Sequence, residues 1–213
     1  MGYGLTMGND CMKRRPGITA LLIGTATLMS LTTLMSSAPA LPSTSPTNGR
    51  PAPIFILRDI QQRRHSLAEL RGRPIALFFF CGCVPCHRCA SLWAEAQQSG
   101  LLDSAASPKP ITVAVFMGDA ASARAFAAET ALDPKQTLLL TDPQEKAATA
   151  YSVTTCPRFF IINSHGVLCR TNNEPGTDPQ TTPATVLVSR AQTALQHLDN
   201  PAISKAVTHA PKR

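Results

Sequence analysis

The chain has 213 residues, 44% of them hydrophobic, and a formal net charge of +7 at pH 7. This length and apolar content suit one ordinary domain with extensions, and they exclude a small domain that needs disulfides or metals to fold. Apart from Arg63-Arg64 and Lys212-Arg213, the basic residues are scattered without interleaved aromatic residues, so we expect a solvated surface and no nucleic-acid partner.

Residues 1–40 have the pattern of a leader. Lys13-Arg14-Arg15 precedes an uncharged, largely apolar stretch from Ile18 to Met35, and Ala38-Pro-Ala40 supplies small residues for cleavage. We favour a cleaved signal peptide, with an uncleaved membrane anchor through residues 17–36 as the alternative. Either interpretation predicts an extracytoplasmic (periplasmic or secreted) domain, where cysteine pairs can persist in the oxidised state.

The rest of the chain divides by composition. Residues 41–53 are rich in proline, serine and threonine, which is typical of an extended linker. The folded domain is expected to span residues 54–200, and residues 201–213 to form a basic tail.

Within this domain, apolar runs and helical patterns alternate. We expect strands at 54–57, 75–80, 111–116, 138–140, 159–162 and 167–170, and helices at about 85–99, 120–130, 143–150 and from 182. For the helix at 143–150, Asp142 is the expected N-cap, with Pro143 in the first turn and Glu145 completing a capping box. The order of elements predicts an α/β layer architecture with parallel central strands and a hairpin at one edge.

Four cysteines fall within residues 81–89, directly after the apolar run at 75–80. A buried strand that leads into Cys83-Val-Pro-Cys86 at the start of a helix presents Cys83 where backbone N–H groups and the helix dipole favour a thiolate. Thiolates attack disulfides, and C-x-x-C beside a strand–helix–strand pattern is typical of a thioredoxin-like redox site. Thiol–disulfide chemistry is therefore the leading interpretation.

Three stretches carry a resemblance to a known family. They are Ala52–Asp59 followed by Ser66–Pro74, then Leu77–Cys86, and Tyr151–Gly166 with its pattern Y-x-V-x-x-x-P-x-x-F-x-I-N-x-x-G. In this order they resemble the thioredoxin superfamily, specifically its extracytoplasmic redoxin branch, which includes thiol–disulfide oxidoreductases and the AhpC-TSA-like peroxidases. The resemblance implies a thioredoxin-like α/β fold: a central mixed sheet flanked by helices, with an N-terminal β-hairpin extension.

The resemblance also implies roles for three residues. Cys83 is expected to be the exposed attacking thiol and Cys86 the buried thiol that closes the disulfide. Pro157 matches the proline that is cis in the family, where it shapes a groove wall beside Cys83 and leaves backbone groups of its neighbour free for an extended substrate. The implied partners are protein disulfides or dithiols and a redox partner that recycles the pair.

The chain departs from the family pattern at three positions. Gly82 replaces an aromatic residue that often precedes the first cysteine. Leu77 stands where many thioredoxins keep a buried carboxylate that helps to deprotonate the resolving thiol. Cys156 replaces the usual Thr or Val before the proline, which brings a third sulfur close to Cys83.

The other cysteines and His87 have simpler structural interpretations. Cys81 and Cys89 are expected to be small buried core residues, with redox tuning as the alternative. Cys156 is as well explained by redox tuning or metal contact as by packing. His87 is expected to be an exposed residue of the first helical turn that, when protonated, lowers a nearby thiol pKa. Cys169 is expected to be structural or free.

A peroxiredoxin-like peroxidase is the first alternative function. Peroxiredoxins resemble the chain in fold, but they place Thr or Ser three positions before the reactive cysteine. That position is Phe80 for Cys83, and it is Cys83 itself for Cys86. Their arginine aligns with Pro157, one position before Arg158. Both differences argue against peroxidase activity.

Non-enzymatic alternatives use the same cysteines. The set Cys81, Cys83, Cys86, Cys89 and Cys156 could hold Zn, Cu(I) or an iron–sulfur unit, or serve as a thiol sensor. Because four of these share one strand–helix junction, we do not expect all four to converge on one ion. We predict no metal and no cofactor. Cys83 to His87 also matches the C-x-x-C-H pattern for covalent haem, but a Phe-rich strand and a helix anchored by Trp93 leave no room for a porphyrin.

Overall fold

The computed structural model describes residues 46–101, 108–172 and 178–198. They all fall within one compact unit, residues 42–213. The expected leader at 1–40 and the basic tail at 201–213 lie outside the described residues and stay predictions. Within the described ranges, no helix is long and apolar enough to cross a bilayer.

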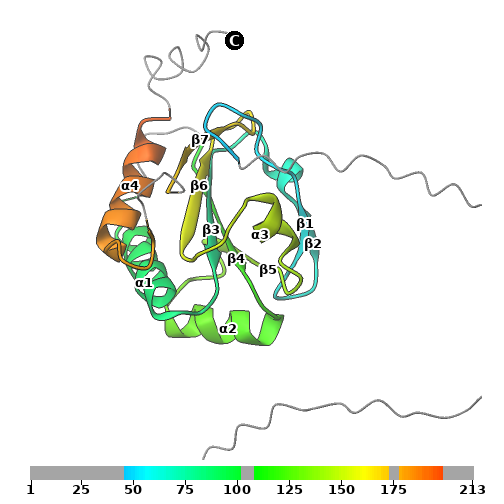
Figure 1. Ribbon diagram of the computed structural model, residues 1–213, viewed down its shortest axis with the longest axis vertical. Helices are drawn as coiled ribbons and strands as arrows, with labels where there is room; N and C mark the ends of the chain where they lie inside the picture. Colours follow the sequence, from blue (N-terminus) through cyan, green and yellow to red (C-terminus); the bar gives the residue numbers. More distant parts are fainter. Residues whose placement is uncertain (1–45, 102–107, 173–177, 199–213) are drawn as a thin grey trace, which may run out of the picture. The chain divides into compact units, whose positions relative to one another are not determined.

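The described residues form a mixed sheet of seven strands in the order β2-β1-β5-β4-β3-β6-β7, drawn in Figure 1. The central strands β3, β4 and β5 are parallel, and β1 and β6 run antiparallel to β5 and β3. The architecture confirms the predicted thioredoxin-like α/β fold. The strands are β1 (Ile56–Asp59), β2 (Arg64–Ser66), β3 (Ile75–Phe80), β4 (Ile111–Phe116), β5 (Thr137–Thr141), β6 (Arg158–Ile162) and β7 (Leu168–Thr171).

Helices cover both faces of the sheet. One face packs against α1 (Val84–Gln98), α2 (Ala120–Glu129) and α4 (Ala184–Gln196). The other face packs against α3 (Lys146–Ala150) and a 3-10 helix at Leu67–Leu70. Because both faces are covered, β3 reads as an unbroken apolar run rather than an alternating one, and all six of its residues are buried.

The two faces of β3 feed two separate hydrophobic clusters. Phe78 and Phe80 point to the α1 side, whereas Leu77 and Phe79 belong to the cluster around Tyr151. Trp93, the expected anchor of α1, is buried with its ring 4.6 Å from that of Phe78. These contacts fix the end of β3 and the start of α1 relative to each other, and this is where the cysteines lie.

The N-terminal hairpin joins the sheet at its edge. β1 pairs with β2 in antiparallel register and with β5 on its other side. Asp59 closes the connection to β2, because its carboxylate accepts hydrogen bonds from the backbone N–H groups of Gln61 and Arg63 and from the Arg63 side chain, and contacts the His65 ring. The predicted hairpin extension is therefore part of the main sheet.

The expected helix at 143–150 begins later than predicted. Residues 143 and 144 form a turn, Glu145 adopts a left-handed backbone conformation (φ 52°), and α3 starts at Lys146. The Asp142 side chain still holds the helix start, accepting from the backbone N–H groups of Lys146 and Ala148. The predicted cap is therefore wrong: the N-cap is Glu145 and not Asp142, and Pro143 lies in the turn before the helix.

Part of the expected linker is also ordered against the sheet. The backbone N–H of Gly49 donates to the Leu168 carbonyl at 2.7 Å, and that of Ala52 donates to the Gly166 carbonyl at 2.9 Å. Pro51 forms a bridge with Val167. Since proline lacks an N–H, the glycine and alanine between the prolines supply the donors. Residues 49–52 therefore extend the folded unit beyond its expected start at residue 54.

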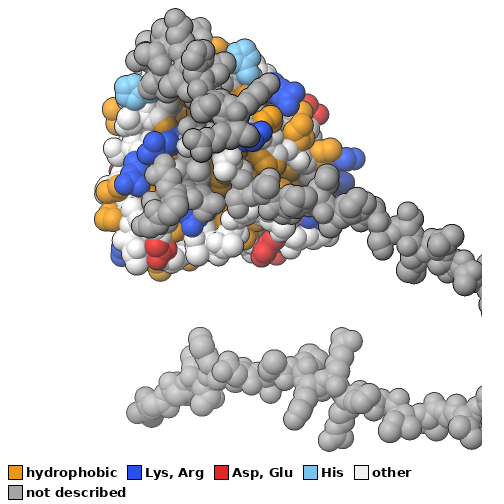
Figure 2. All heavy atoms as spheres, turned by 45° about the horizontal axis from the view of Figure 1, so that its top comes forward, with side chains coloured by type: hydrophobic (Ala, Val, Ile, Leu, Met, Phe, Trp, Pro, Cys, Tyr) orange, Lys and Arg blue, Asp and Glu red, His pale blue; other side chains and the backbone are white. Residues whose placement is uncertain are grey.

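Charged side chains are dispersed on the surface. On the face shown in Figure 2, the Lys and Arg side chains drawn in colour lie at several separate places, and Asp and Glu side chains are visible near the lower edge and at the upper right.

Candidate active site

The site begins where β3 leaves the sheet. Gly82 has φ +81°, in the left-handed region that side chains rarely adopt, and a Cβ there would contact the Phe116 ring at 3.5 Å. This explains why glycine stands where relatives often have an aromatic residue. The turn places Cys83 at the N-cap of α1, followed by Pro85 in the first turn, where a missing N–H costs no hydrogen bond.

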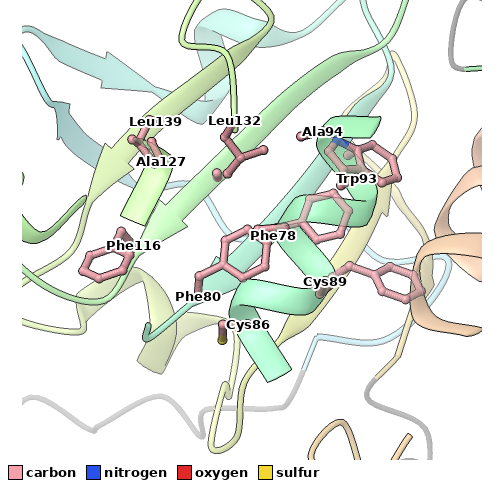
Figure 3. Close-up of a cluster of buried hydrophobic side chains, with 14 of the residues drawn as sticks. Phe78, Phe80, Cys86, Cys89, Trp93, Ala94, Phe116, Ala127, Leu132 and Leu139 are labelled. Atoms are coloured by element: carbon pink, nitrogen blue, oxygen red, sulfur yellow. The ribbon is translucent and has the colours of Figure 1, made fainter. Parts of the chain in front are cut away.

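Cys83 and Cys86 lie together as expected. Their Sγ atoms are 3.2 Å apart, and both are thiols in this structure. Cys83 is partly exposed, whereas Cys86 is fully buried at one end of the aromatic cluster beyond Phe80 (Figure 3). A partner protein can therefore reach the Cys83 sulfur but not the Cys86 sulfur. Both lie at the N-terminus of α1, which is the positive end of the helix dipole.

The surroundings of Cys86 contain no carboxylate among its hydrogen-bond partners in the described chain. The backbone N–H of Cys81 donates to its Sγ at 3.4 Å, and the other partners are cysteine sulfurs, those of Cys81, Cys83 and Cys156. Leu77 packs in the cluster on the opposite face of the sheet. Contacts with the Cys156 and Cys81 sulfurs, together with burial, raise the pKa of the Cys86 thiol.

Cys81 is exposed, so the expectation of a buried core residue was wrong. It is the first residue after β3, and the turn at Gly82 brings its Sγ to 3.8 Å from that of Cys86. The neighbouring Cys156 and Cys86 thiols, followed by the backbone N–H of Cys83, hydrogen-bond to this sulfur and lower the pKa of Cys81 well below its usual range. Of the three clustered thiols, Cys81 is the one that most readily carries a negative charge.

Cys156 brings a third sulfur into the group. The Cys156–Pro157 peptide bond is cis, and the Cys156 side chain is buried. The sulfur atoms of Cys81, Cys86 and Cys156 all lie within 4.8 Å of one another. Of the four cysteines at the strand–helix junction, this group contains Cys81 and Cys86. The contact with Cys81 and burial raise the pKa of Cys156 to about 12. These three residues are the described side chains that could hold a metal ion.

The last two cysteines lie apart from this group. Cys89 is buried in the hydrophobic cluster with Phe78 and Trp93 (Figure 3), and burial raises its pKa to about 12. It fits the expected core role. Cys169 lies on β7 at the far side of β6, half-buried, with its thiol near the Val167 carbonyl.

His87 links the start of α1 to the end of α2. Its Nδ1 lies 3.1 Å from the Cys83 carbonyl oxygen and its Nε2 lies 2.9 Å from the Glu129 carboxylate. The Cys83 carbonyl and then Glu129 raise the pKa of His87. A protonated imidazole one turn from Cys83 would add positive charge at the site, and its effect on a nearby thiol pKa stays a prediction.

Gln180 is a site residue that sequence reasoning missed. Its side-chain Nε2 donates to the Cys156 carbonyl at 2.5 Å and lies 3.9 Å from the Cys83 Sγ. The carbonyl beside Pro157, which we expected to be free for a substrate, is therefore occupied. Nothing in the local sequence marks Gln180, because it reaches the site from a turn held by Asp178, almost a hundred residues after Cys83.

The positions compared with peroxiredoxins are occupied differently here. Phe80 is fully buried and offers no hydroxyl. The Arg158 guanidinium donates to the Asn172 carbonyl at 2.6 Å and to the Thr155 hydroxyl at 2.8 Å. These bonds tie Arg158 to the β6–β7 region.

Comparisons with known proteins agree with this geometry. The sequence profile of the redoxin family matches residues 47–188, whereas no curated protein matches significantly. A secreted disulfide oxidoreductase of Mycobacterium tuberculosis homologous to E. coli DsbE superposes with a TM-score of 0.51, at 18% identity over 65% of this chain and 95% of that one.

Two further solved structures share the fold. A protein of Chlorobium tepidum described as a thiol:disulfide interchange protein, DsbE, gives a TM-score of 0.54, at 23% identity over 71% of this chain and 99% of that one. Peroxidoxin BcpB of Mycobacterium tuberculosis gives 0.58, at 16% identity over 73% of this chain and 99% of that one. At these identities the likeness shows the fold, and disulfide-exchanging and peroxidase proteins share it.

Proposed function

The chain belongs to the redoxin family, and from this premise we propose that it is a thiol–disulfide oxidoreductase whose redox pair is Cys83 and Cys86. One observation carries the proposal: a partly exposed sulfur at the N-cap of α1 lies 3.2 Å from a fully buried one. The proposed substrates are protein disulfides or dithiols.

In the proposed reduction, the Cys83 thiolate attacks one sulfur of a partner disulfide. An S–S bond forms between Cys83 and the partner, and the partner's other sulfur leaves as a thiolate that takes up a proton. Cys86 then loses its proton and attacks the Cys83 sulfur. The Cys83–Cys86 disulfide forms, the partner is released as a dithiol, and two electrons have moved from the chain to the partner. The reverse steps oxidise a dithiol, and a second redox partner recycles the pair.

The geometry supports a division of labour in these steps. Cys83 lies at the N-terminus of α1, and the imidazole of His87, whose pKa is raised, lies beside the Cys83 carbonyl oxygen. The raised pKa of Cys86 keeps that sulfur protonated until a mixed disulfide has formed. Apart from Cys83, the Cys81 sulfur lies close to that of Cys86, with their Sγ atoms 3.8 Å apart.

A peroxidase reaction is less well supported by the same residues. The family and the fold are shared with peroxidases, but Phe80 gives no hydroxyl near the reactive cysteine, and Arg158 is hydrogen-bonded to Asn172 and Thr155. We therefore place disulfide exchange ahead of peroxide reduction. Assaying hydrogen peroxide consumption beside disulfide reduction, with one electron donor, separates the two.

We also propose that the domain works outside the cytoplasm. The support is the leader pattern of residues 1–40, with a membrane tether through residues 17–36 as the alternative to cleavage. Expression of the full chain followed by cell fractionation and N-terminal sequencing tests this. A mature N-terminus near residue 41 supports export with cleavage, and a full-length membrane-bound product supports the tether.

The redox assignment is tested with two serine variants. Cys83→Ser is expected to abolish turnover of a protein disulfide, since it removes the sulfur that is proposed to form the mixed disulfide. Cys86→Ser is expected to accumulate mixed disulfides on Cys83, visible as mass-shifted adducts. Cys169→Ser, at a cysteine away from the site, is the matched control and should keep full turnover. Full activity in either of the first two variants would contradict the proposal.

The direction of electron flow is set by the reduction potential of the pair. Equilibrating the protein in glutathione or dithiothreitol buffers and counting thiols by mass spectrometry measures it. A value near about −270 mV marks a reductant that needs an electron supply, whereas a value near about −120 mV marks a disulfide donor.

A further inference from the structure

Three cysteine sulfurs from three separate parts of the chain meet at one point. Cys81 comes from the end of β3, Cys86 from the first turn of α1, and Cys156 from the loop before β6. Their Sγ atoms lie within 4.8 Å of one another, and those of Cys81 and Cys86 are 3.8 Å apart. The redox pair uses only one of these three, so the other two sulfurs are left without a role in disulfide exchange as proposed above.

We propose that the reduced protein binds one Cu(I) ion through Cys81, Cys86 and Cys156. Binding replaces thiol protons, which pass to solvent, and no electron moves. This activity goes beyond disulfide exchange, and it does not require that exchange to occur.

The spacing of the sulfurs suits a trigonal metal site. Two thiolates bound to one ion at about 2.3 Å each lie about 4 Å apart when the three ligands are spread evenly around it. The Cys81–Cys86 separation of 3.8 Å is already of this size, and the limit of 4.8 Å for the whole group leaves only small movements to complete the site.

The donor atoms favour Cu(I) over zinc. All three side-chain donors are sulfur, and the next neighbour of the Cys156 sulfur is the Met117 thioether at 3.5 Å. Thiolate and thioether ligands together select a soft ion such as Cu(I). A structural zinc site takes four ligands in a tetrahedron, drawn from Cys, His and carboxylates. His87, the imidazole nearest in sequence, is instead held by the Cys83 carbonyl and Glu129.

The three cysteines differ in their exposure to solvent, which would let a metal ion enter the site and then shield it. Cys86 is fully buried and Cys156 nearly so, whereas Cys81 is exposed. An ion can therefore reach the site through Cys81 and be enclosed by the other two sulfurs. A checkable metal site needs its ligands, its distances and an entry path, and all three are present in the described residues.

The arrangement couples the metal to the redox state. Cys86 lies 3.2 Å from Cys83 and 3.8 Å from Cys81, so a Cys83–Cys86 disulfide removes one of the three metal ligands. Copper is therefore expected to bind the reduced protein and to be released when the pair is oxidised.

The test is a titration of the fully reduced protein with Cu(I) under argon, against a chromophoric Cu(I) chelator. One ion per chain is expected for the wild type. Loss of a group that merely orients a metal ligand costs about 10–100-fold in affinity, so Cys81→Ser and Cys156→Ser should each weaken binding by at least about tenfold. Cys83→Ser should keep stoichiometric binding although it abolishes turnover, and Cys169→Ser should change neither.

The contrast between Cys81 and Cys83 decides the outcome. If Cys83→Ser loses copper while Cys81→Ser keeps it, the ion sits on the C-x-x-C pair alone and the proposal is overturned. Absence of one-to-one binding in the wild type, or equal affinity in the oxidised protein, overturns it as well.

Because Cys81 is exposed, Cys81→Ser should fold normally, as checked by circular dichroism, and it carries the test even if the buried Cys156→Ser does not fold. If the wild type binds no copper but still turns over a protein disulfide, the copper proposal is wrong and the proposed function stands. The two proposals can therefore fail independently.

Discussion

Cys81, Cys83 and Cys86 lie within six residues, yet their environments differ in ways that govern their chemistry. Cys81 is exposed and receives hydrogen bonds from neighbouring thiols and a backbone N–H. Cys86 is fully buried, and its surroundings hold its pKa above the usual range. Only the exposed sulfurs can meet a reagent from solvent, and the thiolate rather than the thiol reacts. Reactivity is therefore expected to separate these residues clearly.

Alkylation of the reduced protein checks this ordering. Because the pKa of Cys81 is lowered, its thiolate is present in mildly acidic solution, and iodoacetamide should label it at about pH 5–6. Cys169, whose pKa is raised by burial, should be labelled at least about tenfold more slowly there and serves as the internal reference. Peptide mass spectrometry after short pulses measures both. Equal rates at the two residues would show that the sulfur cluster does not stabilise a thiolate on Cys81.

His87 and Glu129 form the second residue-level feature with a measurable consequence. The Cys83 carbonyl and the Glu129 carboxylate raise the pKa of His87 because both favour the protonated ring. Glu129→Gln is expected to lower that pKa, so the ring loses its proton at a lower pH. A proton NMR titration of the His87 ring measures the change. Glu145→Gln, at an exposed acidic residue outside the site, should leave the titration unchanged, and the same shift in both variants would argue for a general charge effect.

How far the site could be predicted depends on whether its residues are close in sequence. The contact between Cys83 and Cys86 could be predicted because a strand, a turn and a helix start lie next to each other in the chain. Pro157 was found from the family resemblance. The exposure of Cys81 could not be read from its neighbours, because the turn at Gly82 decides which way the sulfur faces. Gln180 reaches the Cys156 carbonyl through tertiary contact alone, and no local pattern encodes such a contact.

At the scale of elements, the strands were predictable because both faces of the sheet are covered. β3 is a continuous apolar run, and β4 and β6 depart from one only at Thr112 and Arg158. Helix starts were less certain, since several polar residues compete for the capping role. In α3 the acceptor was identified correctly as Asp142, but its bonds go to Lys146 and Ala148, and the intervening turn displaces Glu145.

This capping arrangement predicts a measurable loss of stability. The Asp142 side chain is buried and accepts two backbone hydrogen bonds at 2.9 Å. Removing an N-cap acceptor costs about 0.5–2 kcal/mol, and burial of the orphaned N–H groups places Asp142→Ala at about 2 kcal/mol. Asp119→Ala, at the exposed start of α2, should cost about 1 kcal/mol or less.

Urea unfolding of the reduced variants compares the two caps. The midpoint of Asp142→Ala should lie below that of Asp119→Ala, with similar slopes. Asp142→Asn keeps one acceptor and should fall between the wild type and Asp142→Ala. If Asp142→Ala unfolds at the wild-type midpoint, the turn at residues 143–145 alone would be holding the start of α3.

For the molecule as a whole, the hairpin at the edge of the sheet ties stability to acidity through Asp59. Its carboxylate is buried, and burial alone would raise its pKa. Hydrogen bonds from His65, Arg63 and Gln61 outweigh that penalty and lower the pKa of Asp59 to about 2. In the unfolded chain an aspartate titrates at about 3.9. The unfolded state therefore takes up the proton first as the pH falls.

The sign of the pH dependence follows from this order. The contribution of Asp59 is complete above about pH 4 and is lost as the pH falls through about 2. Asp59→Asn keeps an acceptor for the backbone of Gln61 and Arg63 but loses the charge that faces the Arg63 and His65 side chains. It should therefore destabilise the protein by about 1–3 kcal/mol at neutral pH.

Unfolding midpoints of both proteins between pH 2 and pH 7 measure the effect, with Glu145→Gln as the exposed control. The gap between wild type and Asp59→Asn should close toward pH 2, because protonation then removes the charge that the substitution removes. A gap that stays constant across this range would mean that Asp59 acts through packing alone, and that the hairpin is held to β5 by its backbone pairing.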